Sequence, residues 1–206
     1  MAFEKAKVLK AAEKFLSQGK INAAIKEYRQ IVENDQDDLT ALNMLGDLSA
    51  RAGDKNEAVA CFSRIAEHYR EQEFRLKAIA MYKKIEKLKP RDPETATKLA
   101  ELYSAQGLNV DARAQLLIVA DAHTRAGNTK ESLEVLHKIA DLDPQNTEVR
   151  LKLAAGYLKE GMHADAAKAY CEGAARMLEK RDLEHALEAY TKALELLPTT
   201  NRSCAD

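Results

Sequence analysis

The residue types that most often carry chemistry are represented here by five histidines and three cysteines in a chain of 206 residues. A metal site would need several of them close together, for example two histidines four residues apart on one helix face, or paired cysteines. No two histidines have that spacing, and Cys61, Cys171 and Cys204 are far apart. The sequence therefore predicts no metal site and no cofactor, and we expect Cys61 and Cys171 to be small core residues.

Other motifs of enzymes and of nucleic-acid binders are also missing. The sequence contains no Gly-x-Gly-x-x-Gly, no Gly-Lys-Ser/Thr loop and no Gly-x-Ser-x-Gly, so neither a phosphate loop nor a serine nucleophile is predicted. The formal charge of −1 lacks the excess of cations that nucleic-acid binding requires. A charged start, no long apolar run and unpaired cysteines predict a cytoplasmic protein without membrane insertion, and we expect it not to be an enzyme.

The composition indicates which elements must position any binding residues. The chain is 46% hydrophobic and 32% charged, and it has only 8 glycines, 4 prolines and no tryptophan. Ala, Leu, Glu and Lys dominate, and these residues favour helices. The sequence therefore predicts an all-α fold.

An internal repeat divides the chain. Pro90, Pro144 and Pro198 are separated by 54 residues, and the same step relates the glycines at 53, 107 and 161. This period predicts three units, 39–92, 93–146 and 147–200, preceded by a shorter helix pair, 1–38. We expect residues 1–200 to form a single solenoid and 201–206 to be a disordered tail.

Within each unit a small residue is followed four positions later by a bulky one, and the steps between these pairs alternate between 34 and 20 residues. The pairs are Ala24/Tyr28, Ala58/Phe62, Ala78/Tyr82, Ala112/Leu116, Ser132/Leu136, Ala166/Tyr170 and Ala186/Tyr190. A step of 34 fits two helices with their turns, and a step of 20 fits one. The pattern thus predicts three helices per unit, about eleven antiparallel helices in all, with 57–71, 111–125 and 165–179 each serving two helix pairs.

These motifs resemble the tetratricopeptide repeat family over about residues 5–200. Leu45-Gly46, Leu99-Ala100-x-x-Tyr103 and Leu153-Ala154-x-x-Tyr157 stand where the family has its first-helix signature, and the three prolines stand at the repeat ends. The family tryptophan is replaced by Leu42, Ala96 and Arg150, and Ser49 replaces a tyrosine. The resemblance implies a right-handed α-α superhelix and a scaffold or adaptor that holds a protein or peptide partner in its concave groove.

The resemblance also implies which residues line that groove, on the first helix of each pair. They are Leu9, Lys10, Glu13, Asn43, Met44, Asp47, Arg51, Thr97, Lys98, Glu101, Leu151, Lys152, Ala155 and Lys159. Members that bind the carboxylate tails of chaperones have Lys and Asn at places where this chain has Leu9, Glu13 and Met44. A partly apolar helix or extended segment is therefore the expected partner.

Two alternatives stay open at this point. The final helix carries Leu187 and Leu194, which should pack against a following unit, so the chain is either a piece of a longer array or covers this end by self-association or with a partner. A basic cluster at Lys83, Lys84 and Lys87 either forms a solvated helix end or binds an acidic partner.

Overall fold

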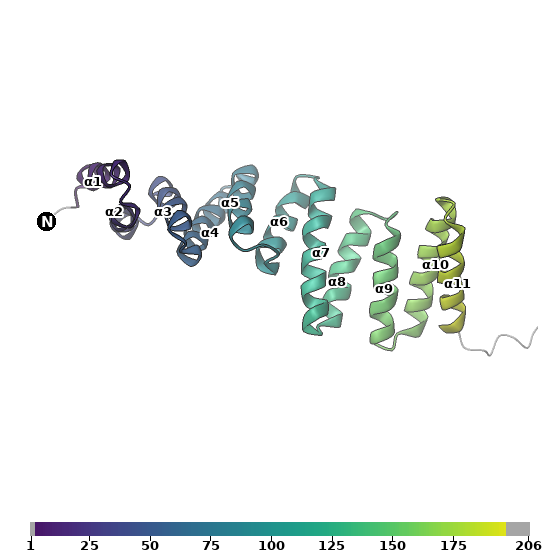
Figure 1. The fold of residues 1–206 in the computed structure, drawn as a ribbon. Helices are drawn as coiled ribbons and strands as arrows, with labels where there is room; N and C mark the ends of the chain where they lie inside the picture. The colour runs from purple at the N-terminus through teal and green to yellow at the C-terminus, as the bar shows by residue number, and fades with distance from the viewer. Residues whose placement is uncertain (1–2, 197–206) are drawn as a thin grey trace, which may run out of the picture. The chain divides into compact units, whose positions relative to one another are not determined.

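The computed structural model of the chain describes residues 3–196, and Pro198, Cys204 and the expected tail 201–206 lie outside these described residues. Residues 3–196 form eleven α-helices and no strand (Figure 1). The helices are α1 (Lys5–Ser17), α2 (Ile21–Asn34), α3 (Leu39–Ala52), α4 (Lys55–Glu71), α5 (Arg75–Leu88), α6 (Pro93–Ala105), α7 (Asn109–Ala126), α8 (Thr129–Leu142), α9 (Thr147–Lys159), α10 (His163–Glu179) and α11 (Leu183–Leu196). The predicted all-α class and the predicted number of helices are confirmed.

The helices gather into two compact units, Met1–Leu102 and Tyr103–Asp206, which we call the N-terminal and the C-terminal unit. The N-terminal unit contains α1 to α5 and most of α6, and the C-terminal unit contains α7 to α11. A single solenoid over residues 1–200 stays a prediction.

Side-chain caps and left-handed residues set the ends of several helices. The carboxylates of Asp38 and Asp54 accept hydrogen bonds from the backbone N–H groups of Ala41 and Glu57, which start α3 and α4. Gly53 ends α3 with φ of 89°, a conformation that glycine adopts without a Cβ penalty. The helices therefore stop where the sequence places its turn residues.

Two turns are made without the glycine that the repeat would supply. Glu73 and Arg181 have φ of 58° and 62°, and they stand 54 residues from Gly19 or Gly127, which have φ of 70° and 78°. Sequence inspection finds no helix stop at Glu73 or Arg181, because neither residue type signals one. The period alone predicts these two turns.

In the N-terminal unit α4 packs against both α3 and α5, as its expected double use requires. Phe62 and Ile65 of α4 and Leu42 of α3 are almost fully buried. Gly46 lets α3 approach closely, since a Cβ there would lie 2.7 Å from Cε1 of Phe62. The glycine of the first-helix signature is thus a packing residue.

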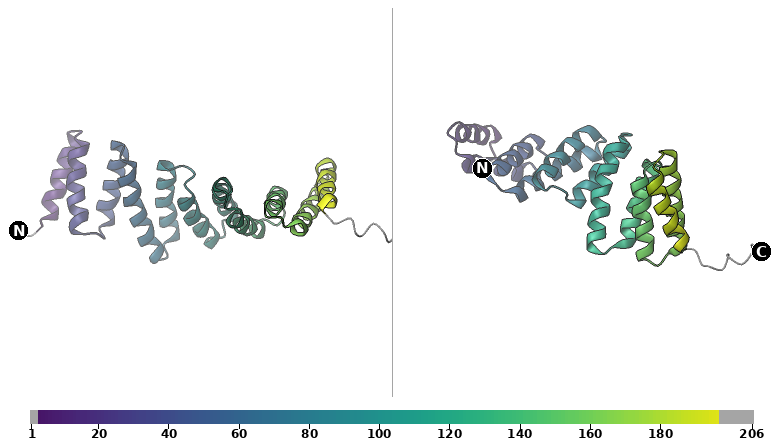
Figure 2. Two further views of the ribbon diagram at one scale, coloured as in Figure 1. Left: turned by 90° about the horizontal axis from the view of Figure 1, so that it is seen from below. Right: turned by 45° about the vertical axis from the view of Figure 1, so that its right-hand side comes forward.

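In the C-terminal unit α10 packs against both α9 and α11 (Figure 2). A core cluster joins α10 and α11 through Ala174, Met177, Ala186 and Ala189, with tyrosines packed against it. Arg150, which occupies the place of the family tryptophan, is half-buried and forms an ion pair with Glu172 of α10 at 3.1 Å. The arginine thus connects α9 to α10 by charge instead of ring packing.

Candidate functional site

Eight of the ten charged or polar groove residues that the sequence singled out lie in the N-terminal unit. They are Lys10 and Glu13 on α1, Asn43, Met44, Asp47 and Arg51 on α3, and Lys98 and Glu101 on α6. The α1 residues and Arg51 are exposed, whereas Asn43, Met44 and Asp47 are half-buried. The sequence-predicted set is thus not uniformly available to a partner.

Lys84 of α5 occupies part of this surface. Its Nζ atom lies 2.9 Å from Oδ1 of Asn43 and 2.7 Å from Oδ1 of Asp47, and 4.6 Å from the ring centroid of Phe62. Asn43 and Asp47 therefore contribute to the packing of α3 with α5. Sequence reasoning missed this role of Lys84, because the residue lies 37 positions from Asp47 in the chain.

Glu101 is also bound within its own unit. Arg70 of α4 pairs with Glu67 at 2.7 Å and with Glu101 at 3.5 Å, and the Tyr82 hydroxyl donates a hydrogen bond to Glu67. Burial raises the pKa of Tyr82, and the bond to the Glu67 carboxylate raises it further, so the hydroxyl remains a donor. We call this space between α4, α5 and α6 the filled crevice. A polar cavity of about 230 Å³, bordered by Lys98, remains beside it.

The other two predicted residues, Lys152 and Lys159, border a pocket of about 320 Å³ in the C-terminal unit. The pocket lies between α7, α8 and α9, and we call it the α9 pocket. Ala155, also predicted to line the groove, faces it, together with the apolar side chains of Leu133 and Leu136 from α8. The structure thus brings three sequence-predicted positions of α9 together around one hollow.

The shape of the α9 pocket depends on a close approach between two helices. A Cβ on Gly156 would lie 2.7 Å from Cδ2 of Leu133, so only glycine permits this distance between α8 and α9. On the α7 side, the Thr124 and Ser132 hydroxyls lie 2.8 Å apart, and both donate to the carbonyl of Ala120. The hydroxyls are therefore satisfied within the protein, and the wall they form needs no ligand.

The 54-residue repeat explains why this pocket is open. Four positions of the filled crevice carry large side chains, and their equivalents at the α9 pocket are smaller or shorter. The pairs are Arg70 and Thr124, Tyr82 and Leu136, Glu101 and Ala155, and Leu102 and Gly156. Four substitutions toward smaller residues thus converge on one place, a signal that alignment of the chain with itself reveals.

The rim of the α9 pocket carries cationic groups. Lys159 is exposed, and within the part of the chain that the structure describes it has no ion pair or hydrogen bond from its side chain. Lys152 pairs with Glu148 at 3.1 Å, one turn earlier on the same exposed surface of α9. Asp121 also lines the pocket and has a partner within the chain. The groups free to meet a ligand are therefore mainly positive.

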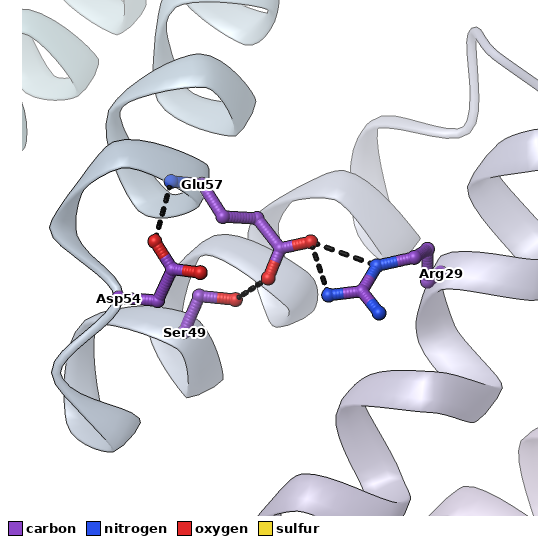
Figure 3. Close-up of polar contacts among 4 residues, drawn as sticks. All are labelled: Arg29, Ser49, Asp54 and Glu57. Atoms are coloured by element: carbon purple, nitrogen blue, oxygen red, sulfur yellow. Dashed lines mark hydrogen bonds and ion pairs between the residues drawn. The ribbon is translucent and has the colours of Figure 1, made fainter.

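A second polar cluster joins α2, α3 and α4 (Figure 3). Ser49 is fully buried where the family has a tyrosine, and its hydroxyl donates to Oε2 of Glu57 at 2.6 Å. Oε1 of Glu57 accepts from Nε and Nη2 of Arg29 at 2.9 and 2.6 Å. Because Asp54 also caps the backbone N–H of Glu57, every part of this cluster is engaged in holding three helices together.

The cysteines show no sign of reactivity in the described residues. Cys61 is buried, and burial raises the pKa of its thiol to about 11, so the thiol stays protonated. Cys171 is half-buried and free. Among residues 3–196 no group of three or more His, Cys, Asp or Glu side chains could hold a metal ion. None of the described helices combines the length and apolarity needed to cross a membrane.

Comparison with known proteins places the first helices in a family. Residues 9–68 match the family model described as "Tetratricopeptide repeat". No curated protein matches the chain.

Several solved structures are similar to the chain at low identity. One is described as the crystal structure of the APC/C hetero-tetramer Cut9-Hcn1, with 14% identity and a TM-score of 0.36 over 93% of this chain. The chain spans only 43% of that protein's length. Another is the TPR2AB-domain:pHSP90-complex of yeast Sti1, with 15% identity, a TM-score of 0.34 and coverage of 92% of this chain and 98% of that one. A third is a tetratricopeptide repeat protein from Parabacteroides merdae, with 17% identity, a TM-score of 0.29 and coverage of 95% and 94%.

All three TM-scores are below 0.5, so these structures carry no argument about what the chain binds. The family assignment depends instead on the matched model and on the helices themselves. The match covers α2 and α3 completely and includes most of α1 and α4, and the same helix pattern recurs after each 54-residue step. The chain is a tetratricopeptide repeat protein.

Proposed function

We propose that the chain is a scaffold that binds a protein or peptide partner on the surface formed by the first helix of each repeat. The observation that carries this proposal is the α9 pocket, an open hollow of about 320 Å³ bordered by Lys152, Ala155 and Lys159. A pre-formed concave surface that is partly apolar and has a few charged groups suits binding with little ordering of the receptor. Binding, without catalysis, is the function that we assign.

Free thiols favour a reducing environment for this function. Cys61 and Cys171 are both unpaired in the structure, and disulfides are rare in the cytosol. We therefore propose a cytoplasmic location.

The proposal is tested by affinity capture from an extract of the source organism, followed by direct titration of each captured protein. A variant with Arg51→Glu, Lys98→Glu and Lys152→Glu reverses three charges on the first helices. We expect it to lose a partner that the wild-type chain retains, because like charges then face an acidic or mixed partner surface.

The matched control reverses three exposed lysines on helices that do not carry the predicted groove. These are Lys26 on α2, Lys130 on α8 and Lys168 on α10, which change the net charge by the same amount or nearly so. The control variant should capture the same partner as the wild type. Equal capture by all three proteins would contradict binding on the first helices.

A second candidate function is self-association through α11. Leu183, Leu187 and Leu194 are 67%, 69% and 68% exposed on this helix, while Ile79 and Leu133, which precede Leu187 by two and one repeat steps, are buried. A second copy of the chain would bury the same leucines by pairing α11 with α11 around a two-fold axis. Sedimentation equilibrium should then give a dimer that Leu187→Glu dissociates, and a monomer at all concentrations would refute this candidate.

A further inference from the structure

We infer that the α9 pocket accepts one bulky apolar side chain of a partner peptide, with an aspartate or glutamate of the same peptide beside it contacting Lys152 and Lys159. This inference rests on the proposed peptide-binding function and names the chemistry of the partner. It depends on the size of the pocket, on its walls and on its rim.

The size of the pocket fits a single side chain. Its volume of about 320 Å³ lies at the lower end of the range of about 300–1,000 Å³ that is usual for small-molecule sites. Leu133 and Leu136 contribute apolar walls, and Ala155 leaves the entrance free. An aliphatic or aromatic side chain would bury its surface against these groups without leaving a protein hydroxyl unpaired, because Thr124 and Ser132 already bond to each other and to Ala120.

The rim determines the charge of the neighbouring residue in the peptide. Lys159 has no partner of its own among the described side chains, and the Lys152–Glu148 pair is exposed and therefore weak. Asp121 on the opposite wall already has a partner within the chain. A carboxylate of the peptide at the α9 side thus gains attraction from two ammonium groups, and a cationic residue would be repelled by them.

The filled crevice is an internal comparison for this assignment. There Arg70 pairs with Glu67 and Glu101, and Tyr82 bonds to Glu67, so the corresponding space is taken by the protein's own side chains. We therefore expect binding at the α9 pocket and not at its equivalent one repeat earlier.

The test begins with a phage library of short random peptides selected on the whole chain. The most enriched peptide is synthesised with a fluorescent label, and its Kd is measured by fluorescence anisotropy. We expect enriched peptides to share a bulky apolar residue with Asp or Glu one to a few positions away. Affinity should also fall as salt increases, because the ion pairs at the rim are solvent-exposed.

Two pocket variants separate shape from charge. Ala155→Phe fills the entrance and should weaken binding by about tenfold or more, whereas Ala114→Phe, at an exposed alanine of α7 outside the pocket, should leave the Kd within about twofold. Thr124→Arg copies the arginine of the filled crevice. It should also weaken binding although it adds a positive charge.

The charge of the rim is tested by Lys152→Gln with Lys159→Gln. This pair should weaken binding of the selected peptide by about tenfold, and the same change at the exposed Lys130 and Lys138 of α8 should have an effect of less than about twofold. Circular dichroism and thermal melting of every variant show whether it is folded before its Kd is compared.

The outcomes separate this inference from the proposed function. Enriched peptides without acidic residues, or a selected peptide that binds Ala155→Phe and Thr124→Arg as tightly as the wild type, would overturn the inference. If such a peptide loses affinity for Arg51→Glu or Lys98→Glu instead, the proposed function stands and only the site is wrong. If the folded chain enriches no peptide at all, both fail.

Discussion

Gly46 provides the sharpest test of how α3 and α4 are held together. Replacing it with alanine adds one Cβ, which would lie 2.7 Å from Cε1 and 3.0 Å from Cζ of Phe62, and 3.1 Å from Cβ of Cys61. Phe62 is only 1% exposed, and Cβ of Cys61 is fixed to the α4 backbone, so neither neighbour has room to move away. Gly46→Ala must therefore push α3 and α4 apart.

The magnitude follows from two opposing effects. Overpacking of a filled core costs about 1–3 kcal/mol, while alanine in a helix interior is about 1 kcal/mol more favourable than glycine. We expect a net loss of about 1–2 kcal/mol in the free energy of unfolding. For a chain of this size, about 2–4 °C per kcal/mol gives a fall in Tm of about 2–8 °C, measured by far-UV circular dichroism on heating.

A double-mutant cycle decides whether the contact with Phe62 is the cause. Phe62→Leu removes Cε1 and Cζ, the two ring atoms nearest the added methyl group. Gly46→Ala should therefore cost less in the Phe62→Leu background than in the wild type. Equal losses in both backgrounds would refute the reasoning.

Gly156→Ala serves as the matched control. Its Cβ would also lie 2.7 Å from a neighbour, but that atom is Cδ2 of Leu133, the end of a flexible side chain that borders the α9 pocket. Leu133 can turn toward the open space, so the overpacking is relieved and the gain in helix propensity remains. We expect the Tm of Gly156→Ala to fall by less than that of Gly46→Ala.

Three further predictions concern other parts of the two units. Ser49→Ala should lower the free energy of unfolding by about 1–2 kcal/mol in urea titrations, because it removes a buried hydrogen bond to the Glu57 carboxylate; an unchanged midpoint would contradict this role. Ala112→Leu should cost about 1–3 kcal/mol, since Ala112 is 0% exposed, and a Tm equal to that of the wild type would show that the site has room. Asp182 bonds to His185 at 2.8 Å, which raises the pKa of His185 above 6.5 and lowers the pKa of Asp182 below 3.8. The pair therefore stabilises the fold between these two values, and this stability is lost as the pH rises through the raised pKa of His185 or falls through the lowered pKa of Asp182. In an NMR titration Asp182→Asn should shift the midpoint of His185 downward, and an unmoved midpoint would disprove the pairing.

Local chemistry explains why the helices were predictable. A helix forms and stops according to propensity, spacing and turn residues within a few positions, and the 54-residue period repeats these signals along the chain. Eleven helices and turns such as Gly53 therefore follow from the sequence. Glu73 and Arg181 are harder, because they adopt left-handed turns without a residue type that announces them.

The state of the groove residues required the tertiary structure. Asn43 and Asp47 were placed correctly on the first helix of a pair, yet the cation that binds them, Lys84, comes from 37 or more positions away. A pattern within one helix contains no information on which distant side chain will reach it. Residues expected to meet a partner are thus partly used by the fold.

The α9 pocket shows the same division between sequence and structure. The sequence by itself determined that Lys152, Ala155 and Lys159 share one face of a helix, because helical periodicity is a local property. Only the tertiary structure decided that this face borders a hollow, since the opening depends on Gly156 meeting Leu133 and on small residues contributed by three helices. Packing between distant segments creates or fills such a space, and a change of a few atoms at the contact determines which occurs.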